Sequence, residues 1–304
     1  MRILRRACYD CGQRRQRVKP SDQPPRGLRE LHHDQPFRRS HAYGDAGVSE
    51  AAWRIGRAHS GSYRHAAMRR SRSMELAGIR LETGASHSVK RWIVQLSGGE
   101  IPVLADEETR ETVVILAHGA GSHMEHKNLE WLAGLVRESG ATPVRFNFLY
   151  RALGKSMPDR MPTLMETYRA VIGSVRQRLA PKRLIIGGHS MGGRVASMIE
   201  AEGQTADGML LFGYPLHPPG QPEKLRDAHL GAIRTPTLQL NGTRDDFCTY
   251  ETMQQVAANL DPEIWDPHWI EAADHSYAVK KSSRRSPKDV EAEILAALAS
   301  WLPS

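Results

Sequence analysis

The sequence feature that most constrains this chain is a short stretch around a serine. Over residues 184–194 an apolar run ends at a glycine pair, a serine follows, and an amphipathic run begins at once. The spacing Gly188-x-Ser190-x-Gly192 fits the nucleophile elbow, a tight strand-to-helix turn that exposes a serine hydroxyl above a sheet. Such a turn strains the serine backbone, and a side chain at either glycine would collide with the neighbouring strand or helix. The N–H of Met191 and the positive end of the helix dipole then face any developing oxyanion.

The glycine-serine-glycine spacing is suggestive but not sufficient. Roughly 0.1 such patterns arise by chance in a chain of this length, so a glycine turn with an incidental serine also fits the spacing. The flanking residues favour the elbow, because an apolar strand pattern at 183–187 leads into it. An inward helical stripe follows at Met191, Val195, Met198 and Ile199.

Strand and helix patterns alternate over residues 75–304, which we interpret as one domain. Strands are expected at 79–81, 91–96, 101–103, 112–117, 143–148, 183–187, 208–213, 236–241 and 264–270. Helical stripes are expected within 129–136, 164–179, 191–199, 253–260 and 290–301, the last opened by a capping serine and a proline at Ser286-Pro287. The continuous apolar run 112–117 is typical of a central parallel strand, whereas Pro267 places the last strand near an edge. The alternation predicts an α/β fold, with a mostly parallel sheet and helices on both faces. Acidic residues 106–108 are expected to form a solvated loop.

Positive charge is concentrated in residues 1–74. This segment carries 17 of the 42 lysines and arginines but 6 of the 34 aspartates and glutamates, which leaves 25 against 28 for residues 75–304. Four prolines and the lack of a sustained hydrophobic period predict a basic, disordered extension. Three other interpretations of this segment remain. It could contact nucleic acid or an acidic membrane surface, or it could be a mitochondrial presequence. Alternatively, translation starts at Met68 or Met74, just before the first strand pattern.

The cysteine spacing and the hydropathy bear on metal binding, redox environment and membrane insertion. Cys8-x-x-Cys11 has the spacing of half a zinc site or of a redox pair, but no second ligand pair completes it, and Cys248 stands alone. Free thiols in a reducing cytoplasm are the simpler interpretation. No apolar run is long enough to span a bilayer. We therefore expect a cytoplasmic protein that has no membrane partner and meets nucleic acid only through its basic extension.

A nucleophilic serine needs a base and a group that orients the base. Asp245 lies in the loop after the strand at 236–241, and His275 lies in the loop after the last strand. Loops at the carboxyl ends of parallel strands converge on one edge, so these residues can meet there. Asp246 is the alternative acid, although the Gly-x-x-Asp spacing favours Asp245. Among rival histidines, His268 lies inside the last strand, and His189 is held in the strained turn, where it cannot reach back as the base.

A second oxyanion donor is expected in the glycine-flanked loop His118-Gly-Ala-Gly121 that ends the strand at 112–117. The N–H of Ala120 is best placed to act together with that of Met191. The same loop also fits an ordinary strand-ending turn. No Walker lysine or dinucleotide-binding pattern follows these glycines, and carboxylates and histidines do not cluster at metal spacing, so we expect neither cofactor nor metal.

Five stretches together carry a family resemblance. They are the loop at 118–121, the elbow at 187–194, Gly-Tyr-Pro-Leu-His-Pro-Pro-Gly at 213–220, Glu-Lys-Leu-Arg-Asp-Ala-His-Leu at 223–230 and Gly-Thr-Arg-Asp at 242–245. Over residues 78–302 the chain resembles the dienelactone-hydrolase-like α/β-hydrolases, and more narrowly the branch that contains a testis-expressed protein and a subunit of the nonspecific-lethal chromatin complex. The resemblance implies an α/β-hydrolase fold with the triad Ser190, Asp245 and His275. Dienelactone hydrolases proper have a cysteine where this chain has Ser190, so their substrate is not implied.

The expected function is that of a serine hydrolase acting on a small-molecule substrate with a carboxylic ester or related acyl bond. No long cap is inserted between the strands, which predicts an open site. The side chains expected to line its substrate pocket are His118, Tyr214, Leu216 and His217, although the loop at 213–230 could instead seal the fold. A non-catalytic interaction module and an acyltransferase that uses the same triad remain alternatives.

Overall fold

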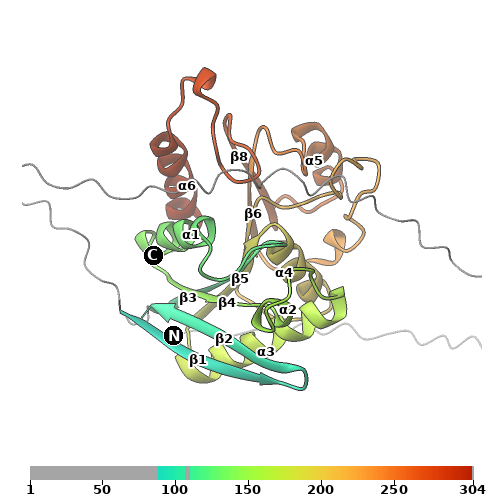
Figure 1. Cartoon of the computed structure of the whole chain (residues 1–304). Helices are drawn as coiled ribbons and strands as arrows, with labels where there is room; N and C mark the ends of the chain where they lie inside the picture. The colour runs from blue at the N-terminus through green and yellow to red at the C-terminus, as the bar shows by residue number, and fades with distance from the viewer. Residues whose placement is uncertain (1–87, 107–109, 303–304) are drawn as a thin grey trace, which may run out of the picture. The chain divides into compact units, whose positions relative to one another are not determined.

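The computed structural model of the chain describes residues 88–106 and 110–302 (Figure 1). The chain divides into two units, Met1–Ala77 and Gly78–Ser304. Every prediction for residues 1–74, including Cys8 and Cys11, and the strand expected at 79–81 lie outside the described residues.

Eight strands within the described residues form one sheet, in the order β1-β2-β4-β3-β5-β6-β7-β8. Their bounds are β1 Val89–Leu96, β2 Gly99–Asp106, β3 Thr112–Ala117, β4 Thr142–Phe146, β5 Arg183–His189, β6 Gly208–Phe212, β7 Thr237–Gly242 and β8 Trp265–Ile270. The hairpin β1–β2 joins antiparallel to β4, and every pairing from β4 to β8 is parallel. The predicted mostly parallel sheet is confirmed, as is the edge position of β8.

Helices cover both faces of the sheet, as the alternating sequence patterns predicted. They are α1 Lys127–Glu138, α2 Leu149–Ala152, α3 Met161–Leu179, α4 Met191–Ala201, α5 Tyr250–Ala257 and α6 Pro287–Trp301, with short 3-10 turns at Leu230–Ala232 and Lys281–Ser283. Figure 1 shows α1 and α6 together on one side of the sheet and α4 on the other. The capping serine and the proline predicted at the start of α6 are present, and Ser286 and Asp289 exchange hydrogen bonds there in a capping box.

Each central strand sends alternate side chains into two separate cores. In β3, Ile115 and its alternate neighbours pack beneath α3 and α4, whereas Val114 and Leu116 pack beneath α1 and α6. All three side chains are fully buried. Burial on both faces explains why β3 is a continuous apolar run rather than an alternating one.

Two local features differ from the sequence predictions. Asp106 belongs to β2 and not to a solvated loop: its side chain is largely buried, and its carboxylate pairs with Arg137 on α1 at 3.0 Å. The strand expected to reach residue 148 ends at Phe146, and α2 begins at Leu149. A helix of one turn shows no periodicity in sequence, so this element could not be predicted from the pattern.

The strand order reverses direction at β3, which pairs with β4 on one side and with β5 on the other. In sheets of this kind ligands bind at the carboxyl edge beside such a reversal. The loops that leave β3, β5, β7 and β8 carry Ala120, Ser190, Asp245 and His275, respectively.

Candidate active site

Ser190 occupies the turn between β5 and α4 with a strained backbone. Its φ is 54° and its ψ is −118°, a region that non-glycine residues rarely adopt. Its N–H donates to the carbonyl of Phe212 on β6 at 2.9 Å, which anchors the turn. A Cβ at Gly188 or Gly192 would overlap the backbone of Ala117 on β3, so the two glycines permit the close approach that the elbow spacing predicted.

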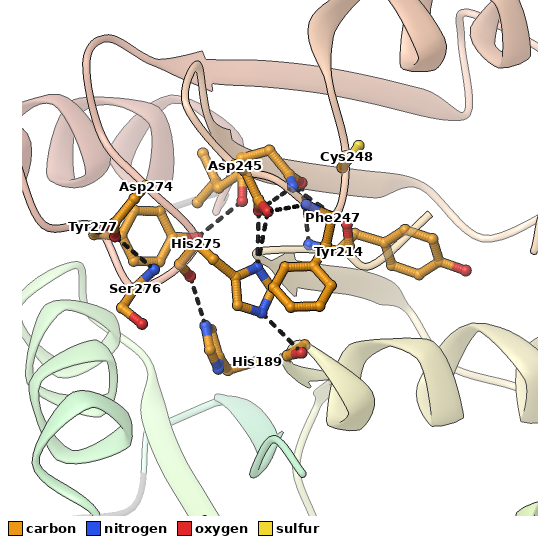
Figure 2. A network of polar contacts seen from close by, with 12 residues as sticks. His189, Tyr214, Asp245, Phe247, Cys248, Asp274, His275, Ser276 and Tyr277 are labelled. Atoms are coloured by element: carbon orange, nitrogen blue, oxygen red, sulfur yellow. Dashed lines mark hydrogen bonds and ion pairs between the residues drawn. The ribbon is translucent and has the colours of Figure 1, made fainter. Parts of the chain in front are cut away.

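His275 lies between Ser190 and Asp245. Its Nε2 is 2.9 Å from Ser190 Oγ, and its Nδ1 is 3.0 Å and 2.9 Å from the two carboxylate oxygens of Asp245. Figure 2 shows the imidazole pointing toward Asp245, with the ring of Phe247 beside it. With Nδ1 protonated and donating to the carboxylate, Nε2 is free to accept the serine proton. The structure therefore brings together the three residues that the sequence singled out.

Asp245 is held in place by more than the histidine. Oδ2 accepts a hydrogen bond from Asn241 Nδ2, and Oδ1 accepts one from the Phe247 N–H, both at 2.9 Å. The side chain of Asp245 is fully buried, whereas neighbouring Asp246 is exposed. The acid next to His275 is thus Asp245, and its orientation is fixed by donors on both oxygens. Asn241 is a supporting residue that sequence reasoning missed, because nothing in its strand pattern distinguishes it.

His189 lines the cavity beside Ser190, but its ring is bonded to the backbone that carries His275 and not to the serine. Its Nε2 donates to the backbone carbonyl of His275 at 2.9 Å (Figure 2). Desolvation, and next the neighbouring His275, lower the pKa of His189 to about 4. It is therefore neutral near pH 7 and positions the loop that carries His275. His268 lies in β8, as the sequence suggested.

The two expected oxyanion donors lie next to Ser190. Met191 is the first residue of α4, so its N–H precedes the helical hydrogen-bond ladder. Ala120 is exposed and lines the same two cavities as Ser190. These positions suit backbone donors that stabilise negative charge developing beside the serine.

The four side chains expected to line the substrate pocket are buried instead. His118, Tyr214, Leu216 and His217 are at most 2% exposed, and none lines either cavity that reaches Ser190 in the described part of the chain. In the loop 213–220 it is Pro215 and Pro219 that face the cavities beside Ser190. The side chains of Tyr214, Leu216 and His217 instead point into the fold. Sequence could not tell which residues of an ordered loop face inward.

His118 has a structural role behind the oxyanion loop. Its Nδ1 donates to the Gly119 carbonyl at 2.8 Å, and its Nε2 accepts from the Phe148 N–H at 3.2 Å. Burial lowers its pKa to about 4. The neutral ring thus ties the loop after β3 to the segment after β4.

We expect the protein to lose stability as the pH falls from about 6.5 toward 4. The pKa of His118 is about 4 in the folded state against an ordinary 6.5, so over this range the unfolded chain binds more protons. A shift of this size is worth on the order of 3 kcal/mol when fully lost, and His189 acts in the same direction. Chemical denaturation at pH 7.5, 6, 5 and 4.5 measures the fall.

The matched control for this prediction is His118→Gln. Glutamine keeps an oxygen that can accept from Phe148 but cannot take up a proton, so the variant is expected to show a shallower fall. A free energy of unfolding that stays flat between pH 7 and 4.5 in the wild type would contradict the prediction.

A second serine–histidine contact lies beneath the site. Ser197 Oγ is 2.8 Å from His229 Nε2, and the hydroxyl of Tyr214 lies 3.1 Å and 3.2 Å from the two groups. Ser197 also donates to the Arg194 carbonyl and is fully buried. Neither Ser197 nor His229 lines a cavity that reaches Ser190. We interpret this cluster as a buried polar network that fastens the loop 213–230 to α4.

Two cavities open beside Ser190. One, of about 380 Å³, is lined by His275 and the loop after β3; the other, of about 320 Å³, is lined by Met191, Arg194 and Arg226. Both are also lined by Ala120, Ser190, Pro219 and Phe247. A bond placed at the serine hydroxyl can therefore extend one substituent into each cavity.

Two properties of the described residues concern metal binding and membrane-spanning helices. Across the described ranges, no three histidine, cysteine or acidic side chains are grouped so as to hold a metal ion. No helix in this part of the chain has the length and apolar character needed to cross a bilayer.

Both a family model and solved structures relate this chain to alpha/beta hydrolases. Residues 110–303 match the model of a family described as alpha/beta hydrolase domain. A serine hydrolase without a lid from Xanthomonas campestris is 20% identical, with a TM-score of 0.56 over 73% of this chain and 98% of that one. An esterase from Pyrococcus furiosus is 16% identical, with a TM-score of 0.57 over 72% of this chain and 94% of that one. A dienelactone hydrolase from Anabaena variabilis is 15% identical, with a TM-score of 0.54 over 72% of this chain and 98% of that one. At these identities the likeness is one of fold.

Proposed function

Since this chain belongs to the alpha/beta hydrolase domain family, we propose that it is a serine hydrolase that cleaves carboxylic ester or related acyl bonds through an acyl-enzyme at Ser190. The observation that carries the proposal is the position of His275, with Nε2 at 2.9 Å from Ser190 Oγ and Nδ1 within 3.0 Å of Asp245. This is the geometry that a general base needs to activate a hydroxyl.

The acylation step follows from these contacts. Ser190 Oγ attacks the ester carbonyl carbon while its proton passes to His275 Nε2. The carbonyl oxygen becomes an oxyanion, and the N–H groups of Met191 and Ala120 stabilise it. Asp245 holds the imidazole tautomer and stabilises the imidazolium. His275 then returns the proton to the leaving oxygen as the ester C–O bond breaks.

Deacylation repeats the steps with water as the nucleophile. His275 takes a proton from the water as the water oxygen attacks the acyl carbon. The proton returns to Ser190 as the acyl–serine bond breaks, and the carboxylic acid leaves. An acyltransferase would use the same first half and a different acceptor in the second, and product analysis separates the two.

A fluorophosphonate probe tests the proposal directly. An activated serine displaces fluoride from phosphorus and becomes covalently labelled, so we expect one label per chain, mapped by peptide mass spectrometry to Ser190. Ser190→Ala should abolish labelling. Ser197→Ala is the matched control, because Ser197 also contacts a histidine, and this variant should label like the wild type.

A protein that remains unlabelled while correctly folded would instead be a non-catalytic interaction module. The narrower placement, in the branch with a testis-expressed protein and a chromatin-complex subunit, stays a prediction that rests on the five stretches named above, of which the loop at 213–220 is the most distinctive.

A further inference from the structure

Two arginines line the cavity on the Met191 side of Ser190. Arg194 lies on the first turn of α4, one turn beyond the serine, and Arg226 comes from the loop 213–230. The remaining wall is largely apolar and includes Met161, Leu164 and Pro215. Both arginine side chains are half-buried, so their charges are partly removed from water.

Within the described part of the chain, neither guanidinium pairs with a carboxylate. Arg194 Nε is buried there without a hydrogen bond. The cavity also contains Asp159, but its Oδ2 accepts a hydrogen bond from the Tyr150 N–H at 2.9 Å. Two cations against one anion leave the cavity with a net positive charge.

The groups packed behind Arg194 are neutral. Burial, and next the charge of Arg194, lower the pKa of His229 to about 4, and burial raises the pKa of Tyr214 to about 12. Desolvation lowers the pKa of Arg226, and the nearby charge of Arg194 adds to that effect. Placing two like charges together, half out of water, is costly unless an anion binds between them.

The direction of the proton transfers assigns each cavity to one part of the substrate. His275 must protonate the leaving oxygen, so the leaving group extends into the cavity that His275 lines. The acyl group then occupies the other cavity, beside Met191 and the arginines. Its volume of about 320 Å³ is at the lower end for ligand pockets and suits a short chain.

We propose that Arg194 and Arg226 bind a carboxylate at the far end of the acyl group, so that the preferred substrates are half-esters of short dicarboxylic acids. The inference rests on the proposed function and adds the substrate class. Arginine forks bind carboxylates through paired hydrogen bonds, and the apolar wall accommodates the methylene chain.

A pair of esters that differ only in the terminal group tests the inference. Mono-4-nitrophenyl adipate and 4-nitrophenyl hexanoate have acyl chains of the same length, ending in a carboxylate and a methyl group, respectively. We expect the wild type to prefer the adipate ester in kcat/KM. Arg226→Met should lower kcat/KM for the adipate ester about 10- to 100-fold and leave that for the hexanoate ester within about 2-fold.

Two variants control for charge and for folding. Lys224→Met removes a positive charge from the same loop at an exposed position outside the cavity and should leave the ratio of the two kcat/KM values unchanged. Arg226→Lys keeps the charge without the fork and should recover part of the preference. Arg226 is the better target, because Arg194 lies against the buried cluster around Ser197 and its replacement could disturb folding.

Binding of adipate itself, measured by calorimetry, gives a readout that does not depend on turnover. The wild type should bind the dianion about 10-fold more tightly than Arg226→Met does. Equal binding, or equal ester preference in the two proteins, overturns the inference and leaves the hydrolase intact. Absence of fluorophosphonate labelling and of turnover with both esters would refute the proposed function, while adipate binding would still decide whether the arginines form an anion site.

Discussion

Ser190→Ala is expected to reduce hydrolysis of a short 4-nitrophenyl ester to the background rate, a loss of about 10³- to 10⁶-fold in kcat. The hydroxyl lies 2.9 Å from His275 Nε2, and without it no oxygen remains to form the acyl-enzyme. The thermal transition should shift little, because alanine keeps the backbone N–H that donates to Phe212. Steady-state kinetics and thermal unfolding on the same preparation measure both effects.

Ser197→Ala should show the opposite behaviour. Ser197 is fully buried and contacts Tyr214 and His229, so its loss leaves polar groups unsatisfied and costs about 1–3 kcal/mol of stability. Turnover by the folded protein should remain close to that of the wild type. If instead Ser190→Ala retained activity and Ser197→Ala lost it, the nucleophile would have been assigned to the wrong serine.

The second large effect is expected for Asp245→Asn, which should lower kcat by about 10³- to 10⁴-fold, as loss of the correct imidazole tautomer does in enzymes with a Ser-His-Asp triad. The carboxylate accepts from His275, Asn241 and Phe247. An asparagine has only one acceptor oxygen, so its amide group faces either the histidine or one of the other donors. When it faces His275, the imidazole is held with Nε2 protonated and cannot take the serine proton.

Asp246→Asn is the matched control for this prediction. Asp246 is adjacent in sequence but exposed, so its replacement should change kcat by less than about 2-fold. Equal losses in the two variants would mean that the loop as a whole, and not one carboxylate, supports the activity.

The sequence predicted the elements whose signal is local and repeated. The apolar run of β3 and the inward stripes of α3 and α4 indicated a parallel sheet with two helical layers, and the glycine spacing indicated the strained turn at Ser190. Asp245 and His275 could be singled out because each follows a recognisable strand. Because the strands are parallel, the loops that follow them lie at the same edge of the sheet, where Asp245 and His275 can meet Ser190.

Other features depend on the direction of individual side chains, which sequence does not encode locally. Nothing in the pattern shows that Tyr214 points away from the cavity while Pro215 faces it. The pairing of Asp106 with Arg137 joins a strand to a helix 31 positions further along the chain. Arg226 meets Arg194 only because the loop 213–230 folds back over α4. Each of these contacts needs the tertiary structure.

The position of β3 in the sheet has a consequence for how the protein gains activity as it folds. Its partner β5 lies about 70 residues away in sequence, and β7 and β8 must add to the same sheet before His275 can meet Ser190. Parallel pairings between distant segments form slowly, since long loops must close first. Recovery of turnover during refolding therefore reports the last assembly step, and helical signal should return ahead of it.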